Sequence, residues 1–328
     1  MSDAFVPYHL RQNKAIDRNL FVELLLHINR YFPIKRYEYI GFGGAFLEDF
    51  KIMHAYTGIK KMISLEIDED VLPRQKFNRP VSCISCTHKS SADFITEYGF
   101  LREIILWLDY MAPSEIGSQL QEIEALTSRL KRGDLVKVTV NANATALARS
   151  TELEKEEDLN QKRFDILEKR IGATNFPADV TPEMMTHALY PQVLYKAIKL
   201  AFHKGMEGSP RHYFQPLTSY VYADGQKMLT FTGIILALDE TQEFFKKTEI
   251  KKWELSVIKD DKPLPINVPE LSIKERMLLD SLLPKYSAET IQKRLKFLVG
   301  KNSEASLEGL RNYVRYYKQY PYFSKILV

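Results

Sequence analysis

The chain has 328 residues, 45% of them hydrophobic and 27% charged, and its net charge is +4 at pH 7. This composition is typical of a soluble globular protein, and the length suffices for one large domain and an appendage. No apolar run approaches the roughly 20 residues that a membrane-spanning helix needs. The first residues lack the apolar core of a signal peptide, and two cysteines give no disulfide framework, so we expect a cytoplasmic protein.

Residues 1–36 are predicted to form an N-terminal helical lid. Apolar residues recur there with helical spacing, at Ile16, Leu20, Leu24 and Ile28. Arg11, Lys14 and Arg18 are spaced three and four residues apart, so the last two at least could share one helical face. These basic residues either form a solvated surface or cover a cofactor or an anionic substrate.

Residues 37–66 contain the pattern around which the rest of the chain is predicted to be built, which is strand, glycine turn, helix and strand. Tyr39 and Ile40 lead into the turn, whose residues are Gly41, Phe42, Gly43, Gly44 and Ala45. The next helix is predicted to bury one face, made of Phe46, Phe50, Met53 and Tyr56. A short apolar strand at 61–65 then ends at Glu66, which follows Gly41 by 25 residues.

This pattern is typical of a nucleoside-binding unit. Glycines at a strand-to-helix turn let the backbone approach a ligand, and an acid at the tip of the next strand can accept both hydroxyls of a ribose. The turn reads Gly-x-Gly-x-Ala and lacks the third glycine of a dinucleotide site. A single nucleoside without pyrophosphate is therefore favoured, of which S-adenosylmethionine is the common case.

Three further strands, separated by helices, are predicted at 81–86, 103–109 and 135–140. The second of these, EIILWLD, is apolar on both faces, as a central parallel strand should be. Alternating strands and helices predict a parallel sheet with helices on both faces, whose ligands bind beyond the carboxyl ends of the strands. The polar tips fall at this edge: the Gly41 turn, Glu66, Ser90-Ser91 and Asp109-Tyr110.

The rest of the chain is predicted to add a helical insertion at 149–204, a hairpin around Asp224-Gly225 and three short helices after 269, with Ser272 and Ser287 as N-caps. Residues 244–265 have no clear pattern. The predicted fold is α/β, a Rossmann-like doubly wound, mostly parallel seven-stranded sheet with an antiparallel C-terminal hairpin. The predicted domains are 1–36, 37–245 and 246–328.

The C-terminal end is basic and aromatic. Residues 270–328 contain eleven Lys or Arg and six Asp or Glu, a balance of +5, so the preceding residues sum to −1. The run YVRYYKQYPYF, which starts at Tyr313, either stacks on single-stranded nucleic acid or packs its tyrosines on the core. Packing is favoured, because Leu310, Val314 and Tyr317 fit one face. A nucleic-acid or protein partner is expected at this end, if anywhere.

With the strand tips placed, the chain resembles class I S-adenosylmethionine-dependent methyltransferases over roughly residues 37–240. More narrowly, it is similar to a group of prokaryotic O-methyltransferases through LRQNKAIDRNLF, YIGFGGAFLEDF, SLEID, RQKFN, WLDY and YADGQKM, in that order. The resemblance implies S-adenosylmethionine as cofactor and an oxygen or nitrogen acceptor. Related genes also resemble ones seen in anti-phage clusters, which suggests a defence role.

The resemblance also implies roles for single residues. Gly41, Phe42, Gly43 and Gly44 would line the methionine part of the cofactor. Glu66 would bind the ribose, with Ile67 beside it in the same site, and Ser90 and Ser91 would lie near the adenine. Asp109 and Tyr110 would lie near the methyl group and its acceptor, where Asp109 is the first candidate for a base or for a ligand of the cofactor amine.

Other candidates are weaker. His88 and His187 are considered as bases, although a lone histidine is more often a surface or capping residue. Cys83 and Cys86 form a Cys-x-x-Cys pair, but no second pair completes four zinc ligands, so no metal site is expected.

Two departures from the family pattern support a second interpretation. Tyr39 stands where an acid usually precedes the first glycine by two residues, and Ser90 stands where an acid is often found at the third strand tip. A weak or inactive methyltransferase-fold subunit would then act as a nucleotide sensor or scaffold with protein or nucleic acid.

The tip that begins at Asp109-Tyr110 also lacks the two prolines of adenine-N6 and cytosine-N4 DNA methyltransferases, which disfavours that chemistry. The sequence identifies neither the acceptor nor the oligomeric state.

Overall fold

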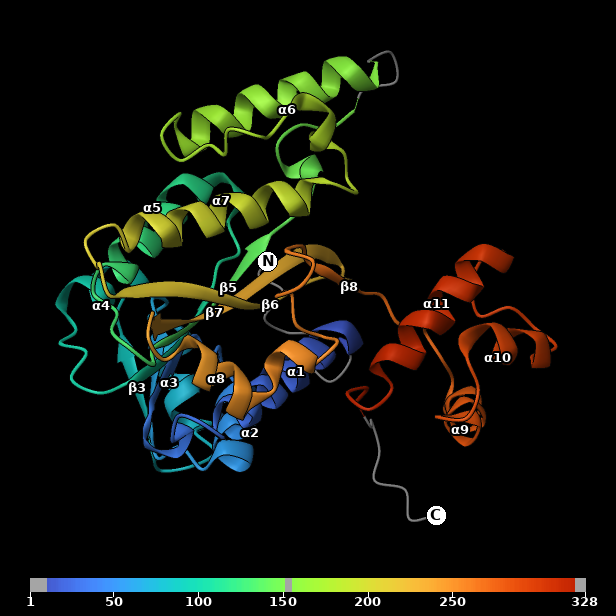
Figure 1. The fold of residues 1–328 in the computed structure, drawn as a ribbon, viewed down its shortest axis with the longest axis horizontal. Helices are drawn as coiled ribbons and strands as arrows, with labels where there is room; N and C mark the ends of the chain where they lie inside the picture. Colours follow the sequence, from blue (N-terminus) through green and yellow to red (C-terminus); the bar gives the residue numbers. More distant parts are fainter. Residues whose placement is uncertain (1–10, 151–154, 322–328) are drawn as a thin grey trace. The chain divides into compact units, whose positions relative to one another are not determined.

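Among the residues that the structure describes, eight strands form one mixed sheet, in the order β3-β2-β1-β4-β5-β7-β6-β8 (Figure 1). The parallel part consists of β1 (Glu38–Gly41), β2 (Lys61–Glu66), β3 (Ile84–His88), β4 (Ile104–Asp109) and β5 (Leu135–Asn141). β7 (Gln226–Ala237) is antiparallel to β5 and follows β6 (His212–Asp224) in a hairpin, and β8 (Leu264–Ile266) is short. The predicted α/β sheet with its antiparallel hairpin is confirmed, and β8 adds a strand that no sequence pattern indicated.

The structure is a computed structural model that describes residues 11–150 and 155–321. It divides into two units. The sheet unit consists of Val22–Val221 and Gln226–Leu264, and the helical unit consists of Met1–Phe21, Tyr222–Gly225 and Pro265–Val328. The domain boundaries predicted at 36/37 and 245/246 are a different division and stay a prediction.

One face of the sheet unit is covered by α4 (Ser91–Glu97), α5 (Ile116–Thr127) and α7 (Tyr190–Gly205), which share one hydrophobic cluster with β4, β5 and β7. Outside them lies α6 (Glu156–Ile171), which packs on α5 (Figure 1). A Cβ at Gly117 of α5 would come within 2.0 Å of the Arg170 carbonyl oxygen, so a glycine is needed for this approach.

The helices α6 and α7 form the predicted insertion, of which residues 151–154 lie outside the described residues. Within the insertion the sequence predicts a helix over 182–204, whereas the second of these helices begins at Tyr190. Residues Pro182–Met185 instead form a separate 3-10 helix, and the Thr186 hydroxyl accepts the amide of Leu189 at 3.2 Å before the α-helix starts.

On the opposite face lie α2 (Glu48–Thr57), α3 (Val71–Phe77) and α8 (Thr241–Thr248) (Figure 1). The predicted four-residue apolar face of α2 is only half correct. Leu47 adopts a left-handed conformation with φ 54°, so the helix begins at Glu48, two residues after Phe46. Phe50 and Met53 are fully buried, whereas Phe46 and Tyr56 are 39% and 63% exposed. The third strand likewise begins at Ile84 and not at residue 81.

The helical unit contains the first half of α1 (Gln12–Ile28) together with α9 (Ile273–Leu282), α10 (Ala288–Arg294) and α11 (Ser303–Tyr316). Ser272 and Ser287 cap α9 and α10 as predicted. The hairpin tip takes part as well, because the Asp224 carboxylate accepts the amides of Asn13 and Lys14 at 3.3 and 2.7 Å. Within the described ranges, none of the helices combines the length and hydrophobicity that crossing a membrane requires.

Candidate functional site

The predicted polar tips come together at the carboxyl edge of the parallel strands. The strands β2, β1 and β4 are neighbours, with Gly41 paired to Ser64 on one side and to Trp107 on the other. Glu66 and Asp109 are the last residues of β2 and β4. The glycine turn is therefore flanked by the two acidic strand ends, as the sequence pattern predicts for a nucleoside site.

The glycine turn is held by contacts with Ser64 of β2 and with Leu47. The Gly43 amide donates to the Ser64 hydroxyl of β2 at 3.0 Å. A Cβ at Gly43 would lie 2.2 Å from Leu47 Cδ2 and 2.7 Å from Ser64 Oγ, so this position has no room for a side chain. Ser64 was not singled out in the sequence, because a lone serine in an apolar strand follows no functional pattern.

Side chains of α3 and of its C-cap residue hold the carbonyl groups of the same turn. Gln75 Nε2 donates to the Gly44 carbonyl at 3.0 Å, and Asn78 Nδ2 donates to the Ala45 carbonyl at 2.8 Å. Both belong to the RQKFN segment that contributed to the family resemblance. Their role in fixing the turn could not be read from the sequence, since it depends on how α3 folds back.

At the tip of β2, Glu66 is partly exposed and is not turned into the interior. Its Oε1 accepts the Asp68 amide at 3.0 Å, which leaves carboxylate lone pairs for a ligand. The next side chain, Ile67, is 71% exposed. An exposed apolar side chain beside a carboxylate suits a nucleoside, whose base is flat and apolar on its face and whose sugar donates hydrogen bonds.

The end of β3 is hydrogen-bonded to the residues at the end of β2. His88 Nε2 lies 3.0 Å from the Ile67 carbonyl oxygen, and the Lys89 amide donates to the Glu66 carbonyl at 3.0 Å. Ser90 caps α4, accepting the Asp93 amide at 3.1 Å and donating to the Asp93 carboxylate at 2.6 Å. A carboxylate thus lies beside Ser90, although the sequence pattern places none at that strand tip.

A carboxylate of α5 joins the residues that follow β3 and β4. Glu122 Oε2 accepts hydrogen bonds from Ser91 Oγ at 2.7 Å and from the Tyr110 hydroxyl at 2.9 Å. Burial, and then the neighbouring Glu122 carboxylate, raise the pKa of Tyr110 well above its ordinary value. The hydroxyl is therefore protonated at neutral pH and acts as a donor to Glu122. Glu122 was missed because nothing in the helical spacing of α5 marks it.

Tyr39, which replaces the usual acid, is buried below the turn. Its side chain is 1% exposed and its ring lies edge-on to Phe50, with the centroids 4.9 Å apart. A Cβ at Gly41 would lie 3.4 Å from the Tyr39 hydroxyl. Tyr39 thus packs under the turn instead of offering a charge to a ligand.

The predicted lid residues belong to the helical unit. Lys14 and Arg18 are only 7% and 2% exposed, and Arg11 is partly buried, so they do not form a solvated surface. Their role over a cofactor or substrate stays a prediction.

His187 lies at the same edge of the sheet as the strand tips. Its carbonyl accepts Lys227 Nζ at 2.7 Å, and the Lys227 carbonyl accepts the amide of Ala142, which follows β5. Burial, with Lys227 and Arg163 nearby, lowers the pKa of His187, so the imidazole is neutral at pH 7.

Cys83 and Cys86 are both free thiols. Within residues 11–150 and 155–321, no cluster of three or more His, Cys, Asp or Glu side chains could hold a metal ion.

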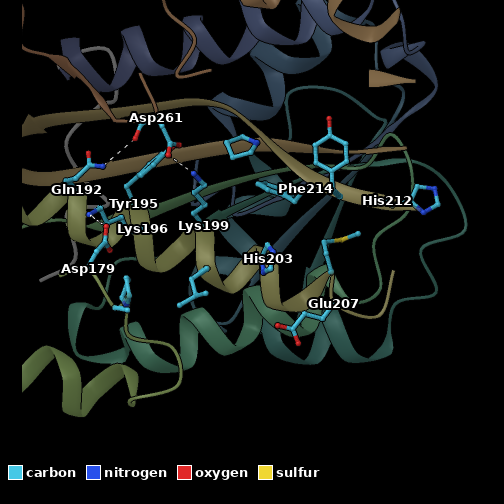
Figure 2. A pocket seen from close by; sticks show the side chains of 16 residues that line it. Asp179, Gln192, Tyr195, Lys196, Lys199, His203, Glu207, His212, Phe214 and Asp261 are labelled. Atoms are coloured by element: carbon cyan, nitrogen blue, oxygen red, sulfur yellow. Dashed lines mark hydrogen bonds and ion pairs between the residues drawn. The ribbon is translucent and has the colours of Figure 1, made fainter. Parts of the chain in front are cut away.

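A separate cavity of about 630 Å³ lies between α7, the start of β6, residues 177–179 and Asp261 (Figure 2). Figure 2 shows Lys196 directed at Asp179 and Lys199 at Asp261, and both ion pairs measure 2.6 Å. β5 begins at the edge of the sheet opposite the glycine turn, and there it pairs with the end of β7. The end of β7 adjoins the start of β6. The cavity beside the start of β6 therefore lies at the opposite edge from the glycine turn. No sequence pattern indicated it.

The Rossmann-like sheet brings the glycine turn after β1 next to Glu66 at the end of β2, which is where open α/β sheets bind their ligands. The chain belongs to the family described as "Putative O-methyltransferase", whose model matches residues 6–328. The match confirms the resemblance found in the sequence and the prediction of an enzyme of the methyltransferase class.

No curated protein matches the chain. Solved structures similar to it include Trm1 from Pyrococcus horikoshii in complex with S-adenosyl-L-methionine, at 13% identity and a TM-score of 0.45, covering 71% of this chain and 58% of that one. The N-methyltransferase NodS from Bradyrhizobium japonicum WM9 is 10% identical with a TM-score of 0.37, over 67% of this chain and 97% of that one. The chain thus spans less than two thirds of Trm1. Similarity this distant carries no information about activity.

Proposed function

We propose that the protein transfers a methyl group from S-adenosylmethionine to an oxygen or nitrogen acceptor. The observation that most supports this is the pairing of β1 with β2, which sets the side-chain-free Gly43 turn next to the partly exposed Glu66. Membership of the methyltransferase family supports the same function. A defence role and a cytoplasmic location stay predictions from the sequence.

The residues at the strand ends fit this cofactor. The turn excludes a side chain at Gly43, and the turn amides other than that of Gly43 can approach the methionine part. Glu66 would accept the two ribose hydroxyls, and the exposed Ile67 would pack against the adenine, near Ser90 and Ser91. S-adenosylmethionine supplies a methyl group activated by its sulfonium charge. The protein then has to orient the acceptor, which can contribute about 7–11 kcal/mol.

Proton transfer from the acceptor falls to Asp109 or His187. Tyr110 is the weaker candidate for a base, because its raised pKa keeps the hydroxyl protonated. Asp109 ends the central strand β4 next to the turn, so it would hold the cofactor amine or take the acceptor proton. His187 is neutral at pH 7 and could accept a proton directly. The interpretation as an inactive subunit depends in part on the acid that Ser90 replaces. Because Asp93 places a carboxylate beside Ser90, the structure does not support this part of the interpretation.

Isothermal titration of the full chain with S-adenosylmethionine and S-adenosylhomocysteine tests the proposal. We expect both to bind, and Glu66→Gln to weaken binding by about tenfold to 100-fold, because hydrogen bonds to a charged acceptor are worth roughly 1.5–3 kcal/mol. Glu69→Gln is the matched control, since Glu69 is an exposed acid three residues away. The proposal is wrong if neither compound binds at millimolar concentration, or if the two variants bind equally well.

A further inference from the structure

The helical unit presents a basic surface that the methyltransferase site does not use. Between residues 285 and 301 the chain has five basic side chains and one acidic one, a balance of +4. The basic residues are all exposed: Lys285, Lys293, Arg294, Lys296 and Lys301. The single acid, Glu289, is paired with Arg311 of α11 at 2.9 Å. The surface therefore carries a concentrated positive charge that the acid within it does not offset.

Aromatic and apolar side chains lie among these cations. Phe297 and Leu298 are 43% and 51% exposed in the segment that follows α10. The Arg294 guanidinium lies 3.8 Å from the centroid of the Tyr286 ring, and Lys285 Nζ lies 5.2 Å from it. Stacking uses the flat face of a guanidinium and leaves its N–H groups, which lie in the plane, to bind an anion.

The segment that presents these residues is fixed against α11. The Val299 amide donates to Ser306 Oγ at 3.1 Å, and a Cβ at Gly300 would come within 2.7 Å of the Ser306 amide nitrogen. Gln292 Nε2 donates to both the carbonyl and the hydroxyl of Ser303 at 2.9 Å. A preorganised surface loses less entropy on binding than a mobile one.

The tyrosines of α11 do not form this surface. Tyr313 and Tyr316 are fully buried, and their hydroxyls donate to Asp280 Oδ1 and to the Pro265 carbonyl at 2.5 and 2.9 Å. Packing therefore explains this part of the aromatic run, whereas Tyr322 and Phe323 lie outside the described residues. A binding surface has to be sought on α10 and on the segment that follows it.

We propose that residues 285–301 bind single-stranded nucleic acid, with the lysines on phosphates and Phe297 stacked on a base. A basic surface with interleaved aromatic side chains is the combination by which proteins bind single strands without reading their sequence. A membrane surface is less well matched, because an interfacial helix buries its apolar face in the membrane, whereas Ala288 and Ile291 of α10 are buried within the protein. This inference goes beyond the proposed methyl transfer and does not depend on it.

Fluorescence anisotropy with the full chain and a labelled 20-nucleotide single strand, as RNA and as DNA of the same sequence, tests the inference. The variant Lys293→Glu/Lys296→Glu/Lys301→Glu should bind at least tenfold more weakly at 100 mM salt. Its log–log salt slope should fall by about 2, because each phosphate contact contributes about 0.7. The control Lys60→Glu/Lys246→Glu/Lys259→Glu changes the net charge equally at exposed sheet-unit lysines and should bind within about twofold of the wild type.

The stacking part is tested by Phe297→Ala, which should weaken binding about tenfold and leave the salt slope unchanged. Circular dichroism and the thermal midpoint check that each variant is folded, and S-adenosylhomocysteine titration checks the other site independently. The inference is overturned if the wild type fails to bind either strand at 50 mM salt, or if both charge variants lose binding equally. Binding to vesicles containing phosphatidylserine but not to oligonucleotides would overturn it in favour of a lipid surface.

Discussion

Gly43 shows how one residue constrains the strand-end site. Its amide donates to the buried Ser64 hydroxyl. A Cβ at this position would lie 2.2 Å from Leu47 Cδ2 and 2.7 Å from Ser64 Oγ, which is closer than nonbonded atoms can approach. Leu47 is fully buried, so it cannot swing away to admit a methyl group. The position therefore couples the shape of the turn to its packing on β2.

Gly43→Ala should distort this turn. We expect the free energy of unfolding to fall by about 1–3 kcal/mol, as overpacking a buried site does, and S-adenosylhomocysteine to bind at least tenfold more weakly. Urea unfolding and calorimetric titration measure the two effects. Gly208→Ala is the control, because a Cβ there meets nothing within 4 Å. Equal behaviour of the two variants would show that the turn tolerates a side chain.

Among the secondary-structure elements, α5 links the chain segments that follow two strand ends. Its Glu122 accepts hydrogen bonds from Ser91, which opens α4 after β3, and from Tyr110, which follows β4. The Tyr110 hydroxyl is buried, so losing its partner would leave a polar group without compensation. One carboxylate thus fixes the two loops that we place near the adenine and the methyl group.

A double-mutant cycle with Tyr110→Phe and Glu122→Ala measures this link. Because the bond is partly buried and one partner is charged, the coupling energy should be about 1.5–3 kcal/mol in urea unfolding. Gln121→Ala, at an exposed neighbour on α5, should show no coupling with Tyr110→Phe. A coupling below about 0.5 kcal/mol for the Glu122 cycle would contradict the assigned role.

For the whole molecule, stability depends on pH through a buried acid. Asp134 is fully buried, and its carboxylate accepts the amides of Ile104 and Lys131 at 2.9 and 2.8 Å. Burial outweighs these hydrogen bonds and raises the pKa of Asp134 to about 6. The folded state therefore holds this proton more tightly than the unfolded chain does. The stabilisation is full below about pH 4 and is lost as the pH rises through 6.

Comparison with Asp134→Asn isolates this effect, because the amide does not titrate. The unfolding free energy of the wild type minus that of the variant should decrease by roughly 2 kcal/mol between pH 4 and pH 7.5. Urea unfolding at four pH values across this range gives the difference. A difference that is constant with pH, or that increases, would contradict the assignment.

The sequence predicted the parts of this molecule that depend on local patterns. The apolar runs of β2 and β4, the Asp224-Gly225 turn and the acidic strand tips Glu66 and Asp109 all lie where the alternation of strands and helices places them. Ser64, Gln75 and Glu122 could not be predicted, because each acts through a hydrogen bond to a residue distant in the chain. Helical spacing also overestimated the buried face of α2. Phe46 precedes the helix because Leu47 in a left-handed conformation delays its start, and Tyr56 lies in the last turn with its side chain exposed.

The central claim is that Glu66 and the glycine turn hold the nucleoside. A crystal structure with S-adenosylhomocysteine tests it most directly. We predict that the Glu66 carboxylate lies at hydrogen-bond distance, about 2.5–3.0 Å, from the ribose hydroxyls, and that Ile67 contacts the adenine. A nucleoside bound instead in the cavity beside α7, against Tyr195 and Asp261, would contradict the claim.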